Sequence, residues 1–248
     1  MRAVLAVASH TALARGTDCP IDAALFAYDR AYEKDKLWAR QRFMGVQCQQ
    51  NPVDAWVLQE ILFDARPQLL IETGTQNGGG ALYYAALMHL YDPDTRVLTI
   101  DARPVEETKE RYAVPGLCAR LGCRNASDTP LWGRHVEFVR GEATAPSVFA
   151  RARRAADDAH SVMVVLDSSH AREHVARELA LYAQLVTPGQ YLVVQDTKLD
   201  RLRGRPGPKA AARDFLRPGG WGSGRFVADR AREYLLYTQH AEGYLRRL

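Results

Sequence analysis

From residue 68 onward, short apolar runs alternate with longer stretches that mix apolar and polar positions. The runs cover residues 68–73, 96–101, 136–140, 161–167 and 190–196. Several are almost continuously apolar, as in Val162-Met-Val-Val-Leu166, and that pattern is typical of strands that are covered on both faces. The runs therefore predict five strands of a parallel sheet.

The stretches between the runs predict helices over residues 79–91, 105–113, 146–158, 171–186 and 208–216. Because right-handed connections place such helices on the faces of a parallel sheet, the alternation predicts a doubly wound α/β fold. Two later runs, residues 225–229 and 233–239, are expected to close the sheet as a pair of strands. The predicted fold is thus Rossmann-like, with a mainly parallel sheet of seven strands made from these runs.

The first 65 residues follow a different pattern, with polar and apolar positions mixed at helical spacing around Asp54–Phe63. We therefore expect an N-terminal helical segment, residues 1–65, packed on a core domain that spans residues 66–248. Residues 20–60 also carry enough apolar helical surface to join subunits, which makes a homo-oligomer through these helices a prediction.

Composition narrows the class of protein. The chain has 248 residues, of which 47% are hydrophobic and 25% charged, as in ordinary globular proteins. Its apolar runs are far shorter than the roughly 20 residues of a membrane-spanning helix, so no membrane partner is expected. The net charge of +4 is small and its basic residues are dispersed, so no nucleic-acid partner is expected.

Targeting signals and cysteines also bear on the class. The start of the chain faintly resembles a signal peptide, but His10 interrupts the apolar stretch. The four cysteines form no Cys-x-x-Cys pair, so neither a zinc site nor a redox motif is indicated. A cytoplasmic location is therefore predicted, with secretion as the weaker alternative.

A glycine-rich loop follows the first predicted strand of the core. It reads Glu72-Thr-Gly-Thr-Gln-Asn-Gly-Gly-Gly80 and opens the next helix. Glycines let the backbone approach a ligand, and the start of a helix favours a negative group. The spacing departs from the Gly-x-Gly-x-x-Gly of dinucleotide-binding enzymes. By itself the loop indicates a nucleoside cofactor no more strongly than a tight strand–helix connection.

Polar residues also end the next two predicted strands. Asp101 stands where a carboxylate can accept both hydroxyl hydrogens of a ribose, although an aspartate there is also a favoured helix cap. The following strand ends in Arg140-Gly-Glu142, where the chain can pass an adenine ring. These residues support a nucleoside ligand without selecting one.

The fourth and fifth strands end in Asp167-Ser-Ser-His170 and Gln195-Asp196. Carboxylates at adjacent strand ends suit a hard divalent cation such as Mg²⁺, which can lower the pKa of a bound hydroxyl. His170 is close enough in sequence to act as a general base on that hydroxyl, although alone it would be interpreted as an exposed helix-start residue. His174, one helical turn further on, is expected on an exposed helix face.

Together these segments resemble the cephalosporin hydroxylase/rhamnosyl O-methyltransferase family over about residues 38–248. The resemblance depends most on two blocks, Leu166-Asp-Ser-Ser-His-Ala-Arg-Glu-His174 and Leu185-Val-Thr-Pro-Gly-Gln-Tyr-Leu-Val-Val194. Gln49-Gln-Asn-Pro-Val-Asp54 and the glycine-rich loop extend it. It implies a class I methyltransferase fold that binds S-adenosylmethionine, often with Mg²⁺, and methylates a hydroxyl of a sugar or another natural product.

The resemblance maps Glu72, Gly74, Asp101 and Asp167 onto cofactor or metal positions of the family. The strand ends and the resemblance together give the following roles. The expected catalytic residues are His170 and Asp167, and the expected metal ligands are Asp167, Gln195 and Asp196. Cofactor contacts are expected at Glu72, Gly74, Gln76, Gly78, Asp101, Ala102, Gly141, Glu142, Asp167 and Ser168. The family often has an acidic residue where this chain has Gln195, so weaker metal binding is expected.

Two alternatives remain open from the sequence. One is a degenerate, S-adenosylmethionine-binding subunit that works through a protein partner, which the neutral Gln195 keeps open. The other is a hydroxylase or a component associated with one. The sequence opposes it. A non-haem iron site uses two histidines and a carboxylate, and only His170 and His174 lie near Asp167 in the sequence.

Overall fold

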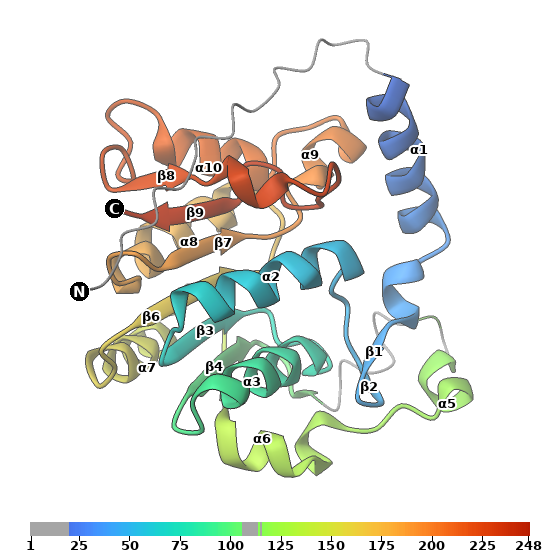
Figure 1. The fold of residues 1–248 in the computed structure, drawn as a ribbon, viewed down its shortest axis with the longest axis vertical. Coiled ribbons are helices and arrows are strands. Elements are labelled where there is room, and N and C mark those ends of the chain that lie inside the picture. Colours follow the sequence, from blue (N-terminus) through green and yellow to red (C-terminus); the bar gives the residue numbers. More distant parts are fainter. Residues whose placement is uncertain (1–19, 106–113, 115) are drawn as a thin grey trace, which may run out of the picture.

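The computed structural model describes residues 20–105, 114 and 116–248 of the chain. At its centre lies a seven-stranded sheet with the order β5-β4-β3-β6-β7-β9-β8 (Figure 1). Five strands are parallel: β3 (Leu69–Thr73), β4 (Arg96–Asp101), β5 (Val136–Arg140), β6 (Val162–Leu166) and β7 (Tyr191–Val194). The predicted doubly wound, mainly parallel sheet is confirmed.

The two closing strands are β8 (Phe226–Ala228) and β9 (Tyr244–Arg247), with β9 antiparallel to both β7 and β8. The predicted strand over residues 233–239 is wrong, because that segment leaves the sheet. The Asp229 carboxylate accepts a hydrogen bond from the Ala231 N–H and starts the short helix η4 (Arg230–Glu233). The place between β7 and β8 is taken instead by β9, whose first two residues are fully buried.

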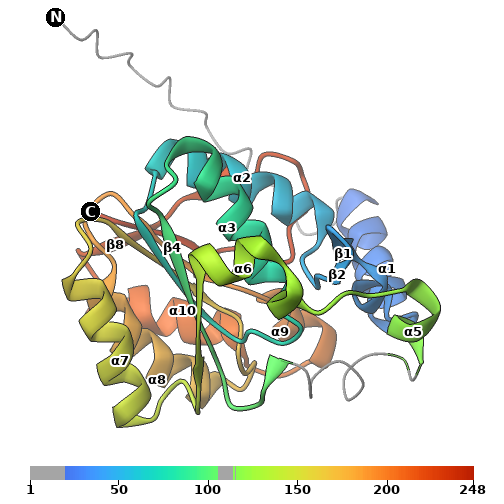
Figure 2. The same ribbon diagram turned by 90° about the horizontal axis from the view of Figure 1, so that it is seen from below.

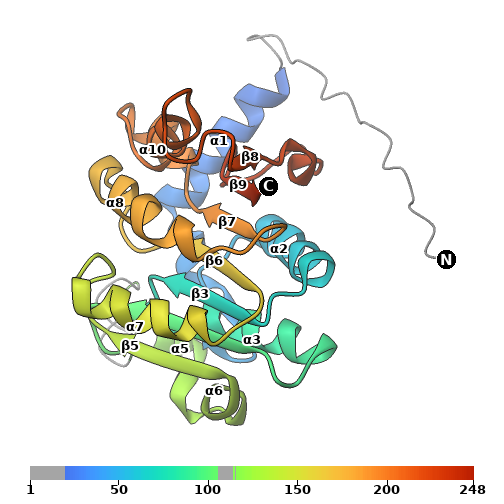
Figure 3. The same ribbon diagram turned by 90° about the vertical axis from the view of Figure 1, so that its left-hand side faces the viewer.

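Successive side chains of the central strands enter two different cores. In β3, Leu69 and Ile71 pack in one core and Leu70 packs in the other. Figure 3 shows α7 and α8 on one side of the sheet and α2 and α3 on the other. The first core is completed by α7 (Pro146–Asp157), α8 (Arg172–Tyr182) and α10 (Pro208–Leu216), and the second by α2 (Pro52–Ala65) and α3 (Gly79–Tyr91).

Most helix predictions agree with the structure to within a few residues. Helices α3 and α10 have the predicted bounds, and α8 ends early but continues as η3 (Ala183–Leu185). The helix expected over residues 105–113 lies almost wholly outside the described residues. Between β4 and β5, the described residues form the short elements α5 (Leu117–Leu121), η2 (Ala126–Asp128) and α6 (Pro130–His135).

The N-terminal segment contains more than the predicted helices. After α1 (Pro20–Lys34) and η1 (Leu37–Arg40), a hairpin of β1 (Arg42–Phe43) and β2 (Val46–Gln47) precedes α2. Strands of two residues are too short to show an alternating pattern, which explains why the sequence did not reveal them. The division at residue 65 and a homo-oligomer through these helices remain predictions.

Helix α1 lies beside α9 (Lys198–Arg203) (Figure 1). Asp29, which is almost fully buried, joins α1 to α9 through Arg201 at 2.7 Å and accepts a hydrogen bond from the Tyr237 hydroxyl at 2.6 Å. Figure 2 shows α1 and the β1–β2 hairpin gathered on the same side of the molecule. Among the described residues, no helix is long and apolar enough to cross a membrane.

Candidate active site

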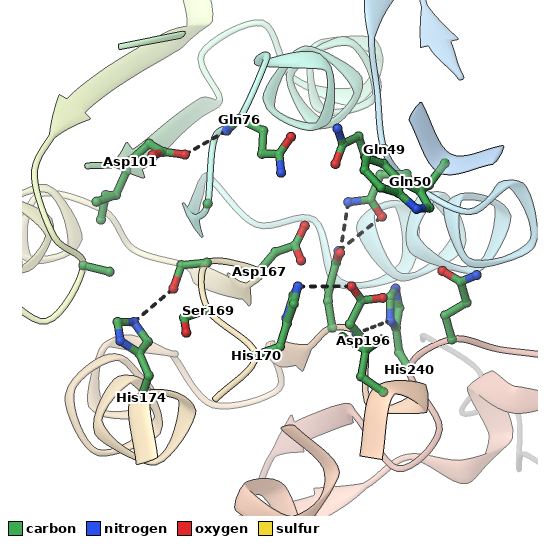
Figure 4. Close-up of a pocket in the computed structure, with 18 of the residues that line it drawn as sticks. Gln49, Gln50, Gln76, Asp101, Asp167, Ser169, His170, His174, Asp196 and His240 are labelled. Atoms are coloured by element: carbon green, nitrogen blue, oxygen red, sulfur yellow. Dashed lines mark hydrogen bonds and ion pairs between the residues drawn. The ribbon is translucent and has the colours of Figure 1, made fainter. Parts of the chain in front are cut away.

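The carboxyl ends of strands β3 to β7 open onto a cavity of about 530 Å³. This volume lies in the range usual for small-molecule sites. The cavity is lined by most of the predicted site residues: Gly74, Gln76, Asp101, Ala102, Gly141, Glu142, Asp167, Ser168, His170, Gln195 and Asp196 (Figure 4). The structure therefore brings the predicted nucleoside and metal residues to one place.

Two glycines of the loop are required by close packing. Gly74 has a φ of +96°, and a side chain there would meet the Asp167 backbone oxygen at 2.2 Å. Gly78, which precedes α3 with a φ of +80°, leaves room for the Trp132 ring, 2.7 Å from an added Cβ. Gly74 lines the cavity, but Gly78 lies outside its lining and supports the loop from behind.

Asp101 holds the loop with both carboxylate oxygens. One oxygen accepts a hydrogen bond from the Gln76 N–H at 2.9 Å, and the other accepts from the Arg103 N–H at 3.0 Å. These two bonds brace the turn after β4, and the Asp101 side chain still lines the cavity. The alternative role of Asp101 as a helix cap stays a prediction, because the helix expected after it lies almost wholly outside the described residues. A carboxylate oxygen has more than one lone pair, so these bonds leave room for a ligand hydroxyl.

Glu72 lies beneath the glycine loop rather than in the cavity wall. It is 2% exposed, and the Thr99 hydroxyl donates to it at 2.6 Å. Burial, opposed in part by this hydrogen bond, raises the pKa of Glu72 to about 8. Its expected contact with the cofactor remains a prediction, whereas its packing under Gly80 is a feature of the fold.

A charged edge, defined here as Asp167, His170 and Asp196, borders the other end of the cavity. The potential metal-binding atoms of these three side chains lie within 4.8 Å of one another. His170 Nε2 is 3.3 Å from an Asp196 carboxylate oxygen (Figure 4). The strand ends of β6 and β7 thus assemble the predicted acid–base and metal residues.

The electrostatics of the charged edge differ between its two acids. Burial, with the negative charge of Asp196 and then of Glu72, raises the pKa of Asp167 well above its usual range. Burial also acts to raise the pKa of Asp196, but His170 and Lys198 outweigh it and lower that pKa. A divalent cation between the two carboxylates would relieve their repulsion, so oxygen ligands and charge both fit Mg²⁺.

The Gln195 side chain is hydrogen-bonded to two other side chains. Its carboxamide exchanges hydrogen bonds with that of Gln50 at 3.1 and 3.2 Å and also donates to the Tyr84 hydroxyl at 3.2 Å. Gln195 is 4% exposed. Its predicted role as a metal ligand is untested, and that role would require its oxygen to be shared with Gln50.

Several residues around the charged edge are not predicted by the sequence pattern. The Lys198 ammonium lies 2.7 Å from Glu33 and 3.7 Å from Asp196, and the side chain is almost fully buried. His240 accepts a hydrogen bond from the Asp196 N–H at 3.0 Å. Glu33 and Gln50 come from the N-terminal segment and His240 from near the end of the chain, so no local pattern could have joined them.

His174 is the one histidine whose placement was predicted wrongly. Its side chain is 14% exposed, lines the cavity and lies 3.1 Å from the Ser168 hydroxyl (Figure 4). The helical spacing placed it one turn from the helix start but could not show which face of α8 turns toward the strand ends. The interpretation as an exposed residue is therefore corrected.

Comparison with known proteins connects this site to one family. Residues 35–248 match the family described as "Rhamnosyl O-methyltransferase/CmcI". The chain is 30% identical to a rhamnosyl O-methyltransferase of Mycobacterium tuberculosis over 182 residues, which are 73% of this chain and 66% of that protein. A Mycobacterium leprae protein of the same name is 30% identical over 183 residues, 73% of this chain and 71% of that protein.

Solved structures show the same fold at lower sequence identity. A CmcI structure described with Mg and SAM has a TM-score of 0.59 and 19% identity, covering 85% of this chain and 77% of that one. A CmcI apo-structure has a TM-score of 0.58 and 19% identity, covering 95% and 87%. These likenesses confirm the predicted fold class. The aligned part spans about two thirds of the first mycobacterial relative's length.

Proposed function

From the premise that the chain belongs to the rhamnosyl O-methyltransferase/CmcI family, we propose that it is an S-adenosylmethionine-dependent O-methyltransferase. Its acceptor is a hydroxyl group of a sugar or of a natural product that carries one. The observation that supports this most is the single cavity that joins Asp101 and the glycine loop to the charged edge. A methyl donor and an acceptor hydroxyl must meet in one such space.

The donor is expected at the end of the cavity formed by β3, β4 and β5. Asp101 accepts the ribose hydroxyls, and the start of α3 after the glycine loop favours the donor's carboxylate. Gly141 and Glu142 border the place of the adenine ring. A donor bound in this way would have its sulfonium methyl group on the side of the charged edge.

At the charged edge, Asp167 and Asp196 would hold a Mg²⁺ ion, whose positive charge would supply a lowered pKa for the acceptor hydroxyl. His170 then takes the hydroxyl proton. Its Nε2 donates to the ionised Asp196, which fixes the ring and leaves Nδ1 as the proton acceptor. The oxygen attacks the methyl carbon, the carbon–sulfur bond breaks, and its electrons remain on sulfur. Alignment of the two reactants supplies much of the rate.

Label transfer tests the proposal. The protein is incubated with methyl-labelled S-adenosylmethionine and a panel of rhamnosides, other glycosides and aromatic diols, with either Mg²⁺ or a chelator. We expect label on a glycoside hydroxyl, with a lower rate in the chelator. Binding of the donor without transfer to any acceptor would instead support the subunit alternative.

The hydroxylase alternative is disfavoured by the set of side chains. The charged edge offers one histidine and two carboxylates, whereas a non-haem iron site uses two histidines and one carboxylate. His174, the nearest further histidine in the sequence, is turned toward Ser168 and Glu178 instead.

A further inference from the structure

A second polar cluster lies in the cavity wall and begins at Ser168, the residue that follows Asp167 of the charged edge. It consists of Ser168, His174 and Glu178, and we call it the α8 cluster. The Ser168 hydroxyl donates to Glu178 at 2.7 Å and lies 3.1 Å from His174 Nε2, which is itself 3.7 Å from the same Glu178 oxygen. Ser168 and His174 line the cavity, whereas Glu178 is buried behind them.

The buried carboxylate determines what His174 can do. Glu178 is 0% exposed, and its second oxygen has no hydrogen-bond partner in the described part of the chain. An isolated buried carboxylate is costly unless a positive charge or several donors compensate it. His174 Nε2 lies at ion-pair distance from Glu178, 3.7 Å from its carboxylate oxygen, and this carboxylate raises the pKa of His174. The ring is therefore held as a hydrogen-bond donor.

The geometry excludes a hydrolytic Ser–His–acid triad. In such a triad the serine donates to one ring nitrogen while the acid accepts from the other. Here both Ser168 and Glu178 lie beside the same nitrogen, Nε2, and the serine donates to the acid. The cluster orients His174 and does not activate Ser168.

The other ring nitrogen, Nδ1, makes no hydrogen bond to any residue that the structure describes. Glu142, which also lines the cavity, is close enough to act on the charge of His174. His174 thus lies at the end of the cavity that holds Ala102, Gly141 and Glu142, where the proposed function places the adenine ring.

We propose that His174 recognises the nucleobase of the donor by giving a hydrogen bond to an acceptor nitrogen of the adenine ring. Glu178 and Ser168 act as positioning residues that keep the imidazole oriented for this contact. The inference rests on the proposed function, because it requires an adenosine-containing donor in the cavity. It adds a base-specific contact to the contacts of the ribose and the carboxylate.

Binding calorimetry with carbon-for-nitrogen analogues tests the contact without requiring turnover. The ligands are S-adenosylhomocysteine and its 1-deaza, 3-deaza and 7-deaza forms, each of which lacks one acceptor nitrogen of the ring. We expect the native protein to bind one of the three about tenfold more weakly than the parent, as is usual for the loss of one hydrogen bond. The His174→Asn protein should bind that analogue and S-adenosylhomocysteine with the same affinity.

Two further variants separate recognition from packing. Glu178→Gln keeps the shape of the buried side chain but removes its charge. It should therefore lower the ratio between the dissociation constant of that analogue and that of S-adenosylhomocysteine. His160→Asn, at an exposed position, should keep the affinity ratio of the native protein. A defect of folding lowers the affinity for all four ligands together and leaves their ratios unchanged.

The possible results distinguish a failure of the His174 contact from a failure of the proposed function. If the native protein binds none of the four ligands, the proposed function fails and the inference fails with it. If it binds S-adenosylhomocysteine but no analogue's relative affinity depends on residue 174, only the inference is overturned.

Discussion

At the donor end of the cavity, Asp101 is fixed by two backbone N–H groups from its own and the adjacent loop. At the charged edge, Asp196 is fixed by His170, Lys198 and His240, which come from separate stretches of the chain. The donor end thus follows from turns at strand ends. The charged edge depends on tertiary packing, including the N-terminal residue Glu33 that holds Lys198.

This difference predicts that the two ends fail separately. Changes at the donor end should alter the affinity for the donor, because its contacts exist before the acceptor arrives. Changes at the charged edge should alter the rate of methyl transfer or the affinity for metal, with little effect on the donor.

The largest effect is expected for His170→Ala. Removal of a general base typically costs about 10²- to 10⁴-fold in kcat, and the dissociation constant of S-adenosylhomocysteine should be unchanged. Steady-state kinetics with the best acceptor and calorimetry measure the two quantities. An unaltered kcat would remove His170 from the mechanism, and weaker donor binding would show that the two ends are coupled.

A smaller effect, on binding, is expected for Asp101→Asn. The amide loses charge-assisted hydrogen bonds to the ribose and to the loop, so the dissociation constant of S-adenosylhomocysteine should rise about 10- to 100-fold. Asp92→Asn is a matched control, because Asp92 also accepts from a backbone N–H two residues on but lies outside the cavity. Equal affinities in the two variants would contradict the assignment of Asp101.

Gln195→Glu should raise the affinity of the charged edge for Mg²⁺. A carboxylate beside Asp196 adds the charge that the amide lacks, so Mg²⁺ should bind about tenfold more tightly, or about 1.4 kcal/mol. Gln184→Glu adds the same charge at an exposed position and should leave the affinity unchanged. Titration calorimetry measures the affinity of both variants and of the native protein for Mg²⁺. Weaker binding in Gln195→Glu would place the metal elsewhere.

Glu72→Gln tests whether burial beneath the glycine loop keeps Glu72 protonated in the folded protein. With a pKa of about 8 in the folded protein and about 4.3 when unfolded, Glu72 keeps a proton that unfolding releases between these values. The free energy of unfolding should therefore fall as pH rises from 5 to 8, by at most about 1.4 kcal/mol per pH unit.

Urea unfolding at several pH values measures this slope. The Glu72→Gln protein cannot release the proton, so its curve should be flatter than that of the native protein. Glu137→Gln, at an exposed salt bridge to Arg151, should keep the native slope. A native slope in Glu72→Gln would show that other groups carry the pH dependence.

The sequence predicts the donor end well because its information is local. Apolar runs locate the strands, and glycines and acids immediately after them mark the ligand edge, as Gly74 and Asp101 do. Even here, the sequence does not show which residues are buried behind the cavity wall. Glu72 is buried under Gly80, and Gly78 packs against Trp132 instead of lining the cavity.

The charged edge is predicted only in part. Asp167 and Asp196 follow from strand ends, but the Gln50 side chain that occupies Gln195 lies 145 residues away in the chain. The face of α8 that carries His174 depends on how the helix packs. The last strand was misplaced because Leu235 and Leu236 are apolar yet exposed, while Tyr244 and Leu245 are the residues that pack in the sheet.

Calorimetry of S-adenosylhomocysteine, first in a chelator and then in Mg²⁺, tests the central claim most directly. We expect binding with one site per chain and the same dissociation constant in both conditions, because the donor end is complete without the metal. No binding in either condition would contradict the assignment of the cavity to a methyl donor.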